Sequence, residues 1–108
     1  MEMHDRMNEG QKIIVRVDAE LAEIIPAFLK NRDTDIQLMH EALKTGDYEI
    51  IRTTGHGMKG AGAGFGFEPI TEMGARIETA AKGKDWESIQ KIISELENYL
   101  QNIEVVYE

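Results

Sequence analysis

The residues best suited to chemistry lie in one short stretch, residues 52–67, whose sequence is RTTGHGMKGAGAGFGF. It contains one histidine, His56, one lysine, Lys59, and six glycines. A neutral imidazole nitrogen is a nucleophile that can carry a transferred group, and a nearby ammonium attracts anionic oxygens. We therefore expect the function of the chain to reside in this stretch.

The six glycines favour a loop at first sight, because each weakens a helix by about 1 kcal/mol relative to alanine. Small and apolar residues nevertheless recur at intervals of four, three, four and three, which is the spacing of one helical face: Ile51, Gly55, Met58, Gly62 and Phe65. This pattern predicts a helix whose small residues allow a neighbour to approach closely. At about 100° per residue, His56 then points into solvent, with Arg52, Lys59 and Gly60 on its own side.

The segment before this helix has a helical pattern of its own. Asp18 is a good N-cap for a helix that begins at Ala19, and apolar residues recur at helical spacing as far as Lys44. Gly46 is placed to end it. Pro26 either kinks this helix or separates a short first segment from a longer second one, and the sequence leaves both open.

Three more helices are expected, from Asp47 to about Gly66, from Pro69 to Gly83 and from Asp85 to Leu100. In the last of them Trp86 is expected to cover one end of the core. The three short connections imply antiparallel neighbours, so the predicted fold class is all-α, an up-and-down antiparallel four-helix bundle.

The two ends of the chain differ from the helical part. Residues 12–17 and 103–107 are short and rich in β-branched side chains, and they could pair as a small antiparallel ribbon beside the bundle. Residues 1–11 are polar and are expected to form a flexible tail. The predicted organisation is thus a tail followed by one bundle domain over residues 12–108.

Composition limits the classes of function. The chain has 108 residues, which suits one domain, and 20 acidic against 12 basic side chains give a net charge of −8. Such a charge repels nucleic acids and anionic membrane surfaces. There is no cysteine, no apolar run of membrane-spanning length and no signal-peptide pattern at the start. We expect a soluble, cytoplasmic monomer that binds neither nucleic acid nor membrane.

The spacing His-x-apolar-Lys-Gly, then small residues, then apolar-Gly resembles the phosphorylation motif of histidine-containing phosphotransfer (Hpt) domains. The residues that carry this resemblance are His56, Met58, Lys59, Gly60, Phe65 and Gly66. Further on, the segment resembles the helix that follows in the same family, at Ile70, Met73, Ile77, Glu78 and Ala80. The likeness extends over roughly residues 18–100.

The resemblance implies a phosphoryl carrier of a two-component phosphorelay, with His56 as the acceptor and Lys59 attracting the phosphoryl oxygens. The implied partners are response-regulator receiver domains and a sensor histidine kinase. The receiver brings the aspartate and a Mg²⁺ ion, whereas this chain has no cofactor, metal site or kinase region of its own. Gly60, Ala63 and Gly64 leave room for the partner to close over the histidine, and Arg52 lies on the same docking face.

Less specific interpretations remain. A solitary exposed histidine is usually only a surface residue, and the chain could be a helical adaptor that binds a receiver domain or another signalling partner without being phosphorylated. Glycines 60, 62, 64 and 66 could instead form an anion-binding loop. Residues 55–60 also match G-x-G-x-x-G, but they lack the preceding buried strand of a dinucleotide site. His4 and His40 have no suitably spaced ligand residues that would suggest a metal site, and we interpret them as surface residues.

Overall fold

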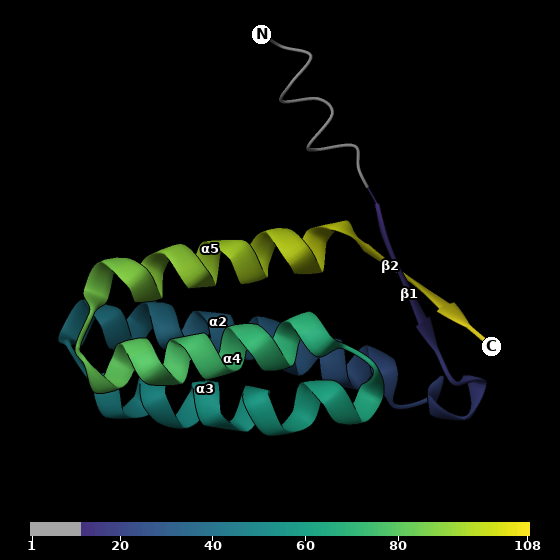
Figure 1. Cartoon of the computed structure of the whole chain (residues 1–108), viewed down its shortest axis with the longest axis horizontal. Helices are drawn as coiled ribbons and strands as arrows, with labels where there is room; N and C mark the ends of the chain where they lie inside the picture. Colours follow the sequence, from purple (N-terminus) through teal and green to yellow (C-terminus); the bar gives the residue numbers. More distant parts are fainter. Residues whose placement is uncertain (1–11) are drawn as a thin grey trace, which may run out of the picture.

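Four long helices, each antiparallel to the next, form the body of the computed structural model, which describes residues 12–108 (Figure 1). The elements in chain order are β1 (Ile13–Val17), the 3₁₀ turn η1 (Ala19–Leu21), α2 (Ile25–Thr45), α3 (Tyr48–Gly62), the 3₁₀ turn η2 (Ala63–Phe65), α4 (Glu68–Lys82), α5 (Trp86–Asn102) and β2 (Ile103–Tyr107). The predicted all-α four-helix bundle is confirmed. The tail predicted for residues 1–11 lies outside the described residues.

The predicted starts of α3 and α5 and the predicted end of α2 agree with the capping residues in the structure, whereas α3 ends at Gly62 and not near Gly66. The side chain of Asp47 accepts a hydrogen bond from the Ile50 backbone N–H at 3.2 Å at the start of α3, and Asp85 caps α5 in the same way. Gly46 ends α2 with φ 73°, a left-handed conformation that glycine adopts without strain. Gly66 does the same after η2, with φ 92°.

The structure decides between the two possibilities at Pro26. Asp18 does cap a helical turn, but this turn is only the short η1, whose Glu20 backbone N–H donates to the Asp18 carboxylate at 2.9 Å. The long helix α2 starts afresh at Ile25, with Pro26 in its first turn. Proline is tolerated there because the first turn has no intrahelical acceptor for its missing N–H. A short segment and a separate long helix are therefore the correct description.

The core contains the apolar faces of all four helices, and most residues predicted to face inward are buried. Met39, Ile51, Ile77 and Leu96 are fully buried. The prediction that Trp86 covers one end of the core is wrong, because the residue is 47% exposed at the first position of α5. No helix within residues 12–108 combines the length and apolar character needed to cross a membrane.

Helices α3 and α4 are the most closely packed pair, and glycines make this approach possible. A Cβ atom at Gly55 would lie 2.9 Å from the Gly74 carbonyl oxygen, and one at Gly74 would lie 2.6 Å from the Lys59 backbone nitrogen. At Gly62 a Cβ would meet Thr71 Oγ1 at 2.5 Å. The prediction of close helix approach over the small residues of α3 is confirmed, and Gly74 supplies the matching position on α4.

The terminal segments pair as predicted, but the predicted orientation is wrong. Strands β1 and β2 are parallel, with Ile13 opposite Ile103 and Val17 opposite Tyr107. Figure 1 shows the reason: β1 runs alongside β2 past the end of the bundle, and the chain then reverses at η1 before entering α2. The ribbon is anchored because Val15 and Val17 are buried against the bundle.

Candidate functional site

His56 lies on the exposed side of α3, away from the buried stripe, as the helical periodicity predicts. Its neighbours Gly55 and Met58 are buried, whereas the His56 side chain is 64% exposed. The helix is continuous through the glycine-rich stretch as far as Gly62. A glycine loop over residues 60–66 is therefore not formed, since Gly60 and Gly62 lie in α3 and Gly64 lies in the 3₁₀ turn η2.

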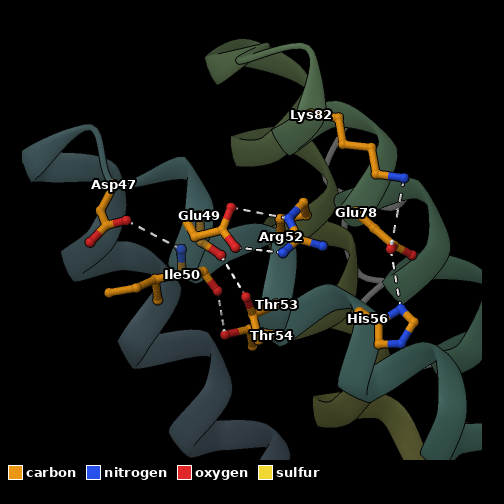
Figure 2. A network of polar contacts seen from close by, with 9 residues as sticks. All are labelled: Asp47, Glu49, Ile50, Arg52, Thr53, Thr54, His56, Glu78 and Lys82. Atoms are coloured by element: carbon orange, nitrogen blue, oxygen red, sulfur yellow. Dashed lines mark hydrogen bonds and ion pairs between the residues drawn. The ribbon is translucent and has the colours of Figure 1, made fainter.

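The imidazole of His56 contacts a carboxylate from the neighbouring helix (Figure 2). Its Nδ1 lies 3.1 Å from Oε2 of Glu78 on α4, whose side chain is only 10% exposed. The contact follows from the glycine packing, because Gly55 precedes His56 and Gly74 lies one turn before Glu78. The close approach of the two backbones brings the Glu78 carboxylate into contact with the imidazole.

Lys59 binds the other oxygen of the same carboxylate. Its Nζ lies 3.1 Å from Glu78 Oε1, and Lys82 approaches Oε2 at 4.0 Å from the end of α4. The hydrogen bond from Lys59, together with that from His56, holds the pKa of Glu78 below its ordinary value although burial acts in the opposite direction. Glu78 is therefore an ionised acceptor at neutral pH.

An ionised carboxylate can only accept hydrogen bonds, so the proton in the contact with His56 resides on Nδ1. In the neutral ring this leaves the lone pair on Nε2. The exposed edge of the ring consequently presents a nucleophilic nitrogen to solvent, while the buried carboxylate fixes the orientation of the ring.

The four residues predicted for docking, which lie on α3 or in η2 directly after it, differ in their surroundings. Gly60, Ala63 and Gly64 are exposed, and a Cβ at Gly60 or Gly64 would have no atom within 4 Å, so neither glycine is required for packing. Arg52 is one turn before His56 and binds Glu49, which raises the pKa of the guanidinium. An exposed pair of this kind contributes little to stability.

Glu78 was assigned no role in the site from the sequence, although it belongs to the helix that resembles the family. One signal was available: this acidic residue directly follows Ile77 on the inward face of its helix, and such positions are seldom charged without a partner. The sequence could not identify that partner, which is 22 residues away on α3.

His40 is not part of the site. His40 Nε2 lies 3.2 Å from Glu97 Oε2, in a contact between α2 and α5, and His4 lies outside the described residues. Within residues 12–108 no group of three or more His, Cys, Asp or Glu side chains is arranged to hold a metal ion.

The protein-family model described as Hpt domain matches residues 23–105, which include the whole site. The chain belongs to the Hpt domain family. Hpt domains are helical-bundle phosphocarrier modules and not kinases, which associates this chain with phosphorelay signalling. Comparisons with curated proteins and with solved structures gave no match.

Proposed function

We propose that this Hpt domain carries a phosphoryl group on Nε2 of His56, accepting it from the aspartyl phosphate of one receiver domain and passing it to another. The observation that carries the proposal is the contact between His56 Nδ1 and Glu78. It holds the ring in the tautomer whose exposed nitrogen is unprotonated.

The transfer step is a simple exchange of bonds at phosphorus. The lone pair of Nε2 forms the N–P bond while the O–P bond of the aspartyl phosphate breaks, and the aspartate leaves as a carboxylate with the bonding electrons. The Nδ1 proton stays in place, so the ring of the phosphorylated histidine is positively charged. The carboxylate of Glu78 stabilises that charge as it develops, which lowers the barrier electrostatically.

The Lys59 ammonium is the second group that favours the phosphorylated state. The phosphoryl group carries a charge of about −1.5 to −2, and Lys59, three residues after His56 on α3, attracts its oxygens while remaining bound to Glu78. Because its side chain is 43% exposed, this attraction is screened and amounts to about 1 kcal/mol or less. Lys59 therefore adjusts the rate and the lifetime of phosphohistidine.

The remaining components come from other proteins. In this proposal the receiver domain contributes the aspartate and Mg²⁺, a sensor histidine kinase supplies the phosphoryl group upstream, and the chain acts as a cytoplasmic monomer. The open surface at Gly60, Ala63 and Gly64 allows the receiver to approach the histidine.

The test is incubation with ³²P-labelled receiver domains, comparing the wild type with His56→Gln and His40→Gln. The wild type and His40→Gln should acquire acid-labile label, whereas His56→Gln should acquire none and should melt at nearly the wild-type temperature. Label on His56→Gln would show that another residue carries the group. A wild type that binds the receiver without label would instead indicate an adaptor.

A further inference from the structure

The carboxylate of Glu78 has a second cationic neighbour, Lys82, which the transfer step described above does not use. Lys82 follows Glu78 by four residues, about one helical turn, and lies in the last turn of α4. Its Nζ is 4.0 Å from Oε2, the same oxygen that contacts Nδ1 of His56, and its side chain is 63% exposed. Figure 2 shows the Glu78 carboxylate between the Lys82 ammonium and the His56 ring. Lys82 therefore contacts the site through Glu78 and not through the imidazole.

Before transfer, the charge of Glu78 is balanced without Lys82. The neutral imidazole of the proposed tautomer adds no charge, and the ammonium of Lys59 binds Oε1 at 3.1 Å. The hydrogen bonds from Lys59 and His56 hold the pKa of the carboxyl group below its ordinary value. In this state a further ion pair with an exposed lysine contributes little.

Transfer of the phosphoryl group changes this balance. The group brings a charge of about −1.5 to −2, while the ring gains one positive charge. Together with Glu78 and Lys59, the phosphorylated ring then has an excess of about half to one negative charge. The ammonium of Lys59 is also shared between the phosphoryl oxygens and the carboxylate, so its attraction for Glu78 falls. One further cation restores the balance. Lys82 is already in contact with Glu78, whereas Arg52 is bound by a carboxylate of its own helix.

We propose that Lys82 is a positioning residue for phosphoryl transfer, which binds Oε2 of Glu78 and keeps this carboxylate at Nδ1 of His56 while Lys59 is shared with the phosphoryl group. The inference rests on the proposed function and adds a residue to its site. No bond to Lys82 forms or breaks, and its protons stay in place.

The need for such a cation follows from the burial of Glu78. Its side chain is only 10% exposed, so little water is available to replace a cation that is partly withdrawn. The phosphoryl group on the other side of the ring repels the carboxylate at the same time. Movement of Glu78 away from Nδ1 would remove the charge that stabilises the imidazolium as it develops, and transfer would slow.

The competing explanation for Lys82 is structural, because a cation in the last turn of a helix interacts favourably with the helix dipole. Lys44 is matched to it in this respect, since it lies in the last turn of α2 and pairs with Glu41 of the same helix at 3.6 Å. Lys82→Gln and Lys44→Gln therefore change the net charge equally, and each removes a cation from a helix end. Of the two lysines, only Lys82 contacts the carboxylate beside His56.

The measurement is kcat and KM for transfer from a ³²P-labelled receiver domain to His56. Lys82→Gln should lower kcat by about three- to fivefold, the upper part of the range for exposed ion pairs, and leave KM within about twofold. Lys82→Arg, which keeps the charge, should stay within about twofold of the wild-type kcat. Lys44→Gln should leave both constants within about twofold, and melting temperatures will show that each variant is folded.

Three results would refute the inference. An equal loss of kcat in Lys44→Gln would assign the effect to a helix end or to net charge. A rise in KM alone would assign it to docking of the receiver. Unchanged constants in Lys82→Gln would exclude Lys82 from the site.

A double-mutant cycle tests whether Lys82 acts through Glu78. In the Glu78→Gln background the carboxylate is absent, so the further change Lys82→Gln should alter kcat by less than about 1.5-fold. Losses that multiply in the double variant would show that Lys82 acts independently of Glu78, and they would overturn the inference.

A small phosphoryl donor separates transfer from docking. Phosphoramidate gives its phosphoryl group to imidazole with loss of ammonia and needs no docking surface, so it too should label Lys82→Gln about three- to fivefold more slowly than the wild type. Labelling of this variant at the wild-type rate would contradict the inference. If no receiver labels the wild type, the proposed function fails, and the inference fails with it; label on the wild type restricts any failure to Lys82.

Discussion

Replacing Gly60 by glutamine should make the protein more stable and less active at once. Gly60 lies on the exposed face of the last turn of α3, four residues after His56, and a Cβ there would have no atom within 4 Å. Its φ is not in the left-handed region, so a side chain introduces no backbone strain. The only intramolecular effect is then the better helix propensity of glutamine.

The expected gain is at most about 0.5–0.7 kcal/mol, the difference between glycine and glutamine in a helix interior, because Gly60 lies in the last turn of α3. For a domain of this size it corresponds to a rise of about 2–4 °C in melting temperature. The new side chain lies about 5–6 Å from that of His56, since residues four apart are neighbours on a helix. It should therefore obstruct a receiver and lower the transfer rate by at least about tenfold, a barrier increase of about 1.4 kcal/mol.

Gly62→Ala provides the matched comparison on the same helix. Its Cβ would lie 2.5 Å from Thr71 Oγ1 and 2.7 Å from the Thr71 backbone nitrogen, and the backbone of α4 cannot move aside without displacing the helix. Overpacking of this kind typically costs about 1–3 kcal/mol, which exceeds the helix-propensity gain of about 1 kcal/mol over most of that range. The two glycine substitutions should thus change the melting temperature in opposite directions.

Thermal unfolding followed by circular dichroism and the initial rate of receiver-to-His56 transfer test both statements. A lower melting temperature for Gly60→Gln would show that the exposed face packs against something in the folded protein. A stabilised Gly60→Gln that accepts phosphate at the wild-type rate would remove Gly60 from the docking surface.

Two further substitutions test the charges around His56. Lys59→Ala should slow transfer or shorten the phosphohistidine lifetime by up to about fivefold, because the exposed interaction amounts to about 1 kcal/mol. The effect should become smaller as the salt concentration rises, since salt screens exposed charges. Unaltered kinetics at low salt would exclude Lys59 from the site. Glu78→Gln should lower stability above about pH 4.5, the ordinary pKa of glutamate, and the difference from wild type should vanish as pH falls through the depressed pKa of Glu78 in the folded state. Melting temperatures that differ equally at every pH between about 2 and 7 would contradict the assigned ionisation of Glu78.

The sequence alone determined the features that depend on neighbouring residues. Asp47 and Asp85 begin helices and Gly46 ends one because capping requires only the local backbone. The exposure of His56 followed from helical periodicity, since a single buried stripe on α3 leaves the opposite side to solvent. The expected role of the histidine came from the resemblance to the family, because periodicity predicts exposure and not function.

The tertiary structure decided the features that depend on how helices are placed relative to each other. Gly55, Gly60 and Gly62 belong to the same run, yet only the position of α4 shows that two of them are packed and one is open. The placement of α4 against α3 also brings Glu78 to His56, although the two residues are 22 positions apart in the sequence. No local rule specifies how two helices are placed against each other. The ribbon is parallel because η1 reverses the chain before α2, a direction that strand propensity does not encode.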